Sequence, residues 1–166
     1  ATGRSPQQNG DAAKAMETSY HNATIEAALQ PDLPICDAHH HLWERPPERY
    51  LLDDLLADFK SGHNIVATVA VECGYGYREQ GPEDLKPVGE TEFLESVAAR
   101  AAADPARTTR TAAAIVGFAD LSLGDGVAAV LEAHAAASMR FRGIRHSATW
   151  DASGALRNEA PSKLLA

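Results

Sequence analysis

Residues 33–43, LPICDAHHHLW, contain the strongest structural signal in this chain. The apolar run before Asp37 predicts a short buried strand at residues 35–41. Side chains alternate faces along a strand, so we expect His39 and His41 to project together and His40 to turn to the opposite face. Two imidazoles that leave a strand end side by side are typical of a metal site. This pair is therefore the first candidate for a functional site.

The composition favours one globular domain inside the cell. The chain has 166 residues, and 45% of them are hydrophobic, which is enough to bury a core. Lys and Arg number 15 against 23 Asp and Glu, so the net charge is −8, and nucleic acid and anionic membranes are not expected as partners. The first thirty or so residues lack the apolar segment of a signal peptide, and no run is long enough for a membrane span. We expect a cytoplasmic protein.

The two cysteines, Cys36 and Cys73, both lie in apolar, strand-like segments. This context favours reduced thiols in the core over a disulfide framework. We therefore predict that neither forms a disulfide.

Three regions are predicted along the chain. Residues 1–15 are polar and without periodicity, and are predicted to be disordered. Residues 16–34 form an N-terminal helix and a lead-in, in which Thr18 or Ser19 caps a helix that runs to about residue 29. Residues 35–166 form the main α/β region.

Beyond residue 34, strand and helix patterns alternate. Nearly continuous apolar runs predict further strands at residues 64–72, 111–118 and 141–147, and helical spacing predicts helices at residues 49–60, 91–103 and 125–138. Four strands joined by helices favour a parallel sheet covered by helices. A long loop, residues 73–89, follows the second strand, and its Tyr75 and Tyr77 are expected either to line the mouth of a site or to cover it.

Two architectures fit four βα units. One is a small open α/β domain, and the other is the N-terminal half of a (β/α)8 barrel, truncated before strand five, because a closed barrel needs about 250 residues. The candidate polar residues favour the half barrel, since they fall at the carboxyl ends of the strands, where barrel enzymes build their active sites. An open doubly wound sheet would instead carry a glycine-rich phosphate loop after its first strand.

The candidates at the strand ends are His39 and His41, Glu72, Asp120, and Arg145 with His146. Glu72 is either a site carboxylate or half of a salt bridge, because burying it unpaired is costly. Arg145 can hold a substrate carboxylate or carbonyl, with a structural ion pair as the alternative. In a regular strand His146 faces away from Arg145, so only one of the two is expected at the centre. Asp120 either joins the site or caps a helix or turn.

Three further residues are predicted to lie outside the centre. We expect His40 in packing or in a hydrogen bond behind the site. His134 is expected at the solvent edge of the third helix, and Asp125 at the start of that helix as its cap.

Four segments resemble the amidohydrolase superfamily, and in particular its amidohydrolase-related (amidohydrolase 2) branch. They are DAHHHLW (37–43), VATVAVECG (66–74), VGFADL (116–121) and FRGIRHSATWD (141–151). Members of this branch include fuconolactonase-like lactonases, pyrone dicarboxylate lactonase and metal-dependent decarboxylases. The resemblance covers residues 33–151, which is only about half the length of such a barrel.

The resemblance implies a TIM barrel with a divalent metal, zinc in particular, bound by His39 and His41. It places the remaining ligands and a catalytic aspartate beyond Ala166. Some lactonases of this branch work without a metal and use the His pair and arginines to polarise the lactone carbonyl. A metal-free site is therefore the alternative.

Two functions follow from these observations. The first is a hydrolase that opens a lactone, or a similar ester or amide, of a small molecule such as a carboxylate-bearing ring. In it His39 and His41 hold the metal or polarise the carbonyl, and Arg145, His146 and Glu72 are the catalytic candidates. The second is an inert half barrel that self-associates, or pairs with another half, through open sheet edges. A decarboxylase of the same superfamily is a further alternative.

Overall fold

The fold is taken from a computed structural model, which describes residues 26–149, 153 and 155. The chain divides into two compact units, Ala1–Pro31 and Asp32–Ala166. The predicted disordered segment 1–15, the predicted helix up to residue 25 and most of the tail after residue 149 lie outside the described residues. Residues 26–29 are not helical, contrary to the prediction. Pro31 lacks a backbone N–H and disfavours the helical conformation in the residue before it, so a helix is not stable here.

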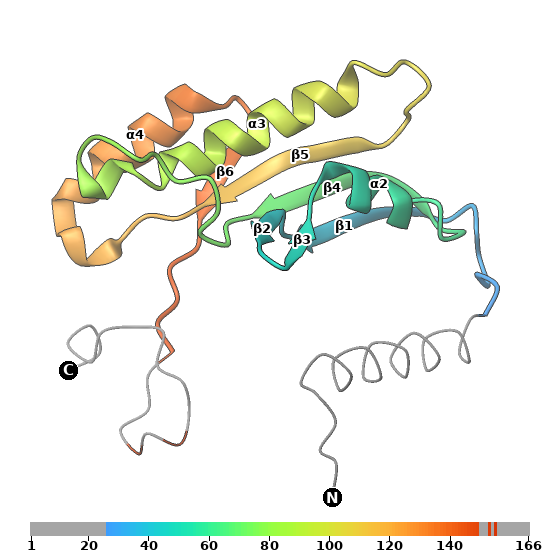
Figure 1. The fold of residues 1–166 in the computed structure, drawn as a ribbon, viewed down its shortest axis with the longest axis horizontal. Helices are drawn as coiled ribbons and strands as arrows, with labels where there is room; N and C mark the ends of the chain where they lie inside the picture. The colour runs from blue at the N-terminus through green and yellow to red at the C-terminus, as the bar shows by residue number, and fades with distance from the viewer. Residues whose placement is uncertain (1–25, 150–152, 154, 156–166) are drawn as a thin grey trace, which may run out of the picture. The chain divides into compact units, whose positions relative to one another are not determined.

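The second unit alternates strands and helices in the predicted order (Figure 1). Its elements are β1 (Pro34–His40), β2 (Trp43–Arg45), β3 (Glu48–Tyr50), α2 (Leu52–Asp58), β4 (Asn64–Val71), η1 (Glu83–Leu85), α3 (Val88–Ala102), β5 (Arg110–Gly117), η2 (Leu121–Gly126), α4 (Val127–Ala137) and β6 (Phe141–Ile144). The predicted strands and the second and third predicted helices are confirmed apart from their end residues. No helix among these elements is both long and apolar enough to cross a membrane.

The four long strands form one parallel sheet in the order β1, β4, β5, β6, which confirms an α/β fold. Helices α3 and α4 lie along one face of this sheet (Figure 1). The core joins apolar side chains of α2, α3, β4 and β5, among them Leu55, Leu94 and Ile115. Complete burial of such a side chain contributes about 2 kcal/mol. This core fixes the strands relative to one another and so fixes the positions of their carboxyl ends.

An antiparallel hairpin, β2 and β3, was not among the predicted elements. Its strands pair Trp43 with Tyr50 and Arg45 with Glu48 around a Pro46–Pro47 turn. The helix predicted at residues 49–60 is therefore shorter, because the cross-strand aromatic pair draws its first residues into the hairpin. The hairpin carries Trp43 and Arg45 to the carboxyl end of β1.

Both cysteines are free, as predicted, but Cys36 is exposed and does not belong to the core. It lies on β1, an edge strand, on a side that the described part of the chain leaves uncovered. Cys73 is half-buried, and burial followed by the nearby Glu90 carboxylate raises the pKa of its thiol to about 12. The Cys73 thiol is therefore protonated at neutral pH.

His134 is fully buried, so its predicted position at a solvent edge is wrong. Its Nε2 donates to the carbonyl of Phe118 (2.9 Å), and its Nδ1 accepts the hydroxyl of Thr91 (2.8 Å). The ring also stacks on Phe141, with centroids 5.0 Å apart. The residue lies on the face of α4 that packs on the sheet. The sequence of α4 is rich in alanine, so its hydrophobic pattern does not distinguish the buried face from the exposed one. His134, on α4, therefore contacts α3, the residue that follows β5, and β6.

Acid should destabilise this protein partly through His134. Burial lowers the pKa of its imidazole below the ordinary value of 6.5, so the unfolded chain binds the proton more readily. The stabilising contribution is complete above about pH 6.5 and is lost as the pH falls below it. In urea titrations, the wild type should lose more stability between pH 7.5 and 5.5 than His134→Gln. Equal losses in the two proteins would contradict this assignment.

Candidate functional site

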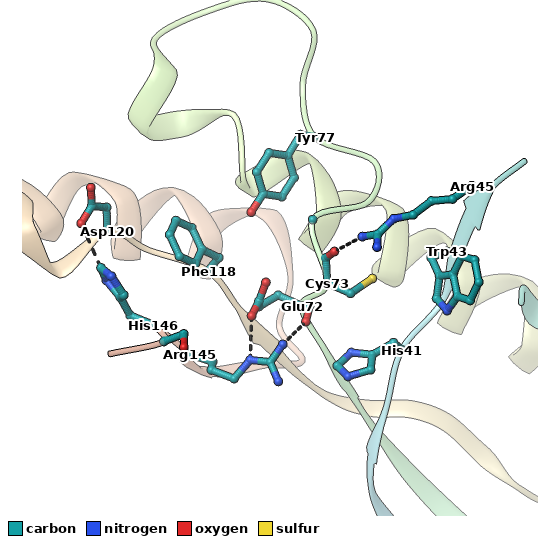
Figure 2. Close-up of a pocket in the computed structure, with 12 residues that line it drawn as sticks. His41, Trp43, Arg45, Glu72, Cys73, Tyr77, Phe118, Asp120, Arg145 and His146 are labelled. Carbon is teal, nitrogen blue, oxygen red and sulfur yellow. Dashed lines mark hydrogen bonds and ion pairs between the residues drawn. The ribbon is translucent and has the colours of Figure 1, made fainter. Parts of the chain in front are cut away.

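A pocket of about 960 Å³ opens at the carboxyl ends of the parallel strands (Figure 2). It is lined by His41, Trp43, Arg45, Glu72, Cys73, Gly74, Tyr77, Phe118, Asp120, Arg145, His146 and Ser147. Because parallel strands end at one edge of the sheet, residues far apart in the sequence converge there. All of the strand-end candidates line the pocket except His39, which lies beside it.

His39 and His41 lie together, as predicted from the sequence. Their Nε2 atoms are 3.1 Å apart, and their rings meet edge to face. The pairing of β1 with β4 is irregular between Asp37 and His40, and the His39 N–H donates to the Asp37 side chain at 3.1 Å. This break in the regular pairing bends the backbone at the end of β1, next to the two histidines.

The tautomer of a neutral His41 ring follows from its hydrogen bond to the main chain. Its Nδ1 lies 2.9 Å from the carbonyl oxygen of Val71. A carbonyl only accepts, so in the neutral ring Nδ1 carries the proton and Nε2 presents a lone pair. That lone pair faces His39, which either shares a proton with it or binds a cation together with it. His41 Nε2 is therefore a ready proton acceptor or ligand.

Glu72 and Arg145 form an ion pair at the ends of β4 and β6. Arg145 Nε donates to Glu72 Oε1 at 2.6 Å, and Nη2 donates to the Glu72 carbonyl oxygen at 2.7 Å. Arg145 Nη1 is 3.5 Å from His39 Nε2. The ion pair predicted as one alternative for these residues is confirmed; both side chains also line the pocket (Figure 2), and their role in a functional site stays a prediction. Glu72 neutralises the guanidinium and fixes its plane.

His146 lines the pocket together with Arg145, but it lies at the end of the pocket beside Asp120 (Figure 2), so the expectation that only one of the two reaches the centre stays a prediction. Strand β6 ends at Ile144, and the alternation of faces does not extend past it. His146 Nδ1 accepts the backbone N–H of Leu121 at 2.9 Å. Its Nε2 must then carry the proton of the neutral ring. His146 is a hydrogen-bond donor, in contrast to His41.

Asp120 caps the short helix η2, which was one of the two roles predicted for it. Its carboxylate accepts the N–H of Ser122 at 2.9 Å, and hydrogen bonds from Ser122 hold the pKa of Asp120 below its usual value. Asp120 also lines the pocket, 3.7 Å from His146 Nδ1. Asp125, predicted as the cap of the third helix, makes no side-chain cap, because η2 runs directly into α4 and Gly126 precedes it.

The loop after β4 is held by Glu90, a buried carboxylate of α3. The backbone N–H groups of Cys73, Gly74 and Tyr75 all donate to it, at 2.8 to 3.3 Å. Burial raises the pKa of Glu90, and the hydrogen bonds oppose that shift. The anchored loop places Tyr77 in the pocket, whereas Tyr75 packs edge to face on Phe93.

His40 lies behind the site, which confirms the prediction of packing or a hydrogen bond there. Its Nε2 is 2.9 Å from the hydroxyl oxygen of Thr68, which also accepts the N–H of Ala112. Burial lowers the pKa of His40. His40 therefore links β1 to β4 and β5 without entering the pocket.

Sequence reasoning missed several residues of this site, among them Trp43, Arg45 and Glu90. The segment WERPPERY carries a usable signal, since two short polar and aromatic runs flank a Pro–Pro turn, as in a hairpin. Glu90 has no such signal, because its partners are main-chain groups of a distant loop. The site is thus wider than the strand ends alone indicate.

The described residues supply two metal ligands at most. The 3.1 Å between the His39 and His41 Nε2 atoms is close to the roughly 3.3 Å expected for two imidazoles on one tetrahedral zinc. Within the part of the chain that the structure describes, no group of three or more His, Cys, Asp or Glu residues is placed to hold a metal. Two ligands alone do not complete a tetrahedral zinc site, and the Arg145 guanidinium, 3.5 Å from His39 Nε2, opposes a cation there. The zinc site therefore stays a prediction.

Comparisons of this chain with protein-family models, with curated proteins and with solved structures found no match.

Proposed function

We propose that this chain is part of a hydrolase of the amidohydrolase-related kind, which opens a lactone or a similar ester or amide. The observation that carries the proposal is the division of roles in the pocket. His41 Nε2 offers a lone pair, whereas Arg145 and His146 Nε2 offer N–H donors. A proton acceptor and N–H donors that line one pocket are the groups that acyl transfer to water needs.

The proposed reaction is the attack of water on a lactone carbonyl. His41 Nε2 takes a proton as the water oxygen bonds to the carbonyl carbon. Arg145 and His146 donate to the carbonyl oxygen as it becomes an oxyanion. The ring carbon–oxygen bond then breaks, and the ring oxygen takes the proton back from His41. The product is a hydroxy acid, and no step uses a metal.

The parallel sheet is proposed to belong to a (β/α)8 barrel. Support comes from the order β1, β4, β5, β6, in which each strand lies beside the next long strand of the chain. Further support comes from helices that share one core on one face, and from a pocket at the carboxyl ends of the strands. These features are common to barrels and to smaller α/β sheets, so the barrel is part of the proposal.

Arg145→Met should lower the rate of lactone opening by about 10²- to 10³-fold, the usual cost of removing an oxyanion donor. The assay follows acid release from γ- and δ-lactones, with and without EDTA. Arg142→Met is the matched control, because Arg142 lies on β6 just before Arg145, is exposed, and donates to the carbonyls of Met139 and Phe141. Activity that survives EDTA supports the metal-free mechanism, and activity that zinc restores supports His39 and His41 as ligands.

A second candidate function is assembly without catalysis, which the open sheet favours. β1 and β6 are edge strands among the described residues and present unpaired backbone groups. If the wild type opens none of the lactones and light scattering shows a dimer or larger assembly, this second function is favoured and the hydrolase proposal fails for the chain alone.

A further inference from the structure

The pocket is lined by two arginines that differ in whether a carboxylate lies within ion-pair distance. Arg145 is paired with Glu72. Arg45 also lines the pocket, yet no carboxylate of the described residues lies within ion-pair distance of it. His41 and His146 are both compatible with neutral rings in their hydrogen bonds. Among these pocket groups, Arg45 carries the positive charge that has no carboxylate of the described residues within ion-pair distance, although Glu48 lies opposite it in the hairpin.

Arg45 is held in place although its charge is unpaired. Its Nη2 donates to the carbonyl oxygen of Cys73 at 2.6 Å, at the start of the loop that Glu90 anchors. Its guanidinium carbon lies 5.8 Å from the centre of the Trp43 ring. A cation above an indole is stabilised by about 0.5–1 kcal/mol at an exposed site. One hydrogen bond leaves the other N–H groups of the guanidinium available.

We propose that Arg45, held over Trp43, is the subsite that binds a carboxylate group of the substrate. This inference rests on the proposed function, to which it adds the residue that holds the carboxylate of the substrate. A guanidinium fork matches a carboxylate in two parallel hydrogen bonds. One uncompensated charge suits a monoanion better than a phosphate dianion. The Trp43 ring, which also lines the pocket, offers an apolar surface beside the bound group.

The position of Arg45 sets the orientation of the substrate. In Figure 2, Arg45 and Trp43 lie at one end of the pocket, Asp120 and His146 at the other, and Arg145 between them. A carboxylate at Arg45 leaves the lactone carbonyl near Arg145 and His41. The acidic end at Asp120 would repel the same carboxylate, so the reversed orientation is disfavoured.

Binding is tested with the full chain carrying Trp150→Phe, which makes Trp43 the sole tryptophan and its fluorescence the reporter. The probes are 5-oxotetrahydrofuran-2-carboxylate and its carboxamide, which has nearly the same shape but is neutral and has an NH2 group in place of one acceptor oxygen. We expect the carboxylate to bind about ten-fold more tightly, which corresponds to about 1.4 kcal/mol. Arg45→Gln should abolish this preference, and Arg45→Lys should keep part of it. Arg49→Gln, on the other strand of the hairpin and outside the pocket lining, should leave it intact.

Each other outcome has a definite meaning. Equal binding of both probes, binding of neither, or a preference that survives Arg45→Gln in a folded variant would overturn the subsite. Circular dichroism establishes that each variant is folded. If the carboxylate binds through Arg45 but its ring is not opened, the subsite stands and the proposed hydrolase function fails.

Discussion

His41→Asn should reduce lactone opening by about 10²- to 10⁴-fold, the range for loss of a general base. The asparagine amide nitrogen takes the place of Nδ1 and can still donate to the carbonyl of Val71. The substitution therefore removes Nε2, the proton acceptor, while it keeps the main-chain contact. kcat should fall more than KM rises, because proton transfer occurs in the transition state. Initial rates of acid release over a range of lactone concentrations measure both constants.

Two comparisons separate a base from a residue that merely positions others. His63→Asn removes an exposed histidine before β4, outside the pocket lining, and should leave the rate within two-fold, about 0.4 kcal/mol. His41→Ala leaves space for imidazole, so imidazole in the buffer should restore part of its rate. A His41→Asn variant with wild-type turnover would remove His41 from the mechanism.

Gly89→Ala should destabilise the fold by about 2–3 kcal/mol, although alanine usually favours a helix over glycine by about 1 kcal/mol. Gly89 lies in the first turn of α3, where an added Cβ would be 2.5 Å from both the Arg78 nitrogen and the Gly76 carbonyl oxygen. Both are main-chain atoms that no side-chain rotation can move. The loop and the helix would have to separate, which also shifts Tyr77 in the pocket. Urea unfolding followed by circular dichroism measures the change.

Gly126→Ala is the matched control for this substitution. Gly126 lies at the start of α4, and the nearest atom to an added Cβ there is Leu123 Cβ at an ordinary 3.7 Å. We expect its stability to stay within about 1 kcal/mol of the wild type. If both variants unfold at the same urea concentration, the close contact at Gly89 does not affect the free energy of unfolding.

The parts of the fold that follow local rules were predictable. Apolar runs marked β4 and β5, and helical spacing marked α3, because their patterns are set by the geometry of the backbone itself. The prediction for residues 49–60 was only partly right, since the pairing of Trp43 with Tyr50 competes with helix propensity over the first residues.

The composition of the pocket was predictable only at the strand ends. A chain that alternates strands and helices brings the carboxyl ends together, so Glu72 and Arg145 were expected at one edge. Their hydrogen bond joins residues 73 apart in the sequence. The donor role of His146 depends on the N–H of Leu121, and the burial of His134 depends on Thr91. No periodicity encodes contacts of this kind.

The amino-acid order alone established the parallel α/β pattern and the pairing of His39 with His41. Both follow from steric rules that act over a few residues, so they need no knowledge of distant partners. Tertiary packing determined which nitrogen of His41 and of His146 carries the proton, because main-chain groups of other elements supply their hydrogen bonds. It also left Arg45 without a carboxylate partner among the described residues, since the hairpin and the loop after β4 meet only in the folded chain.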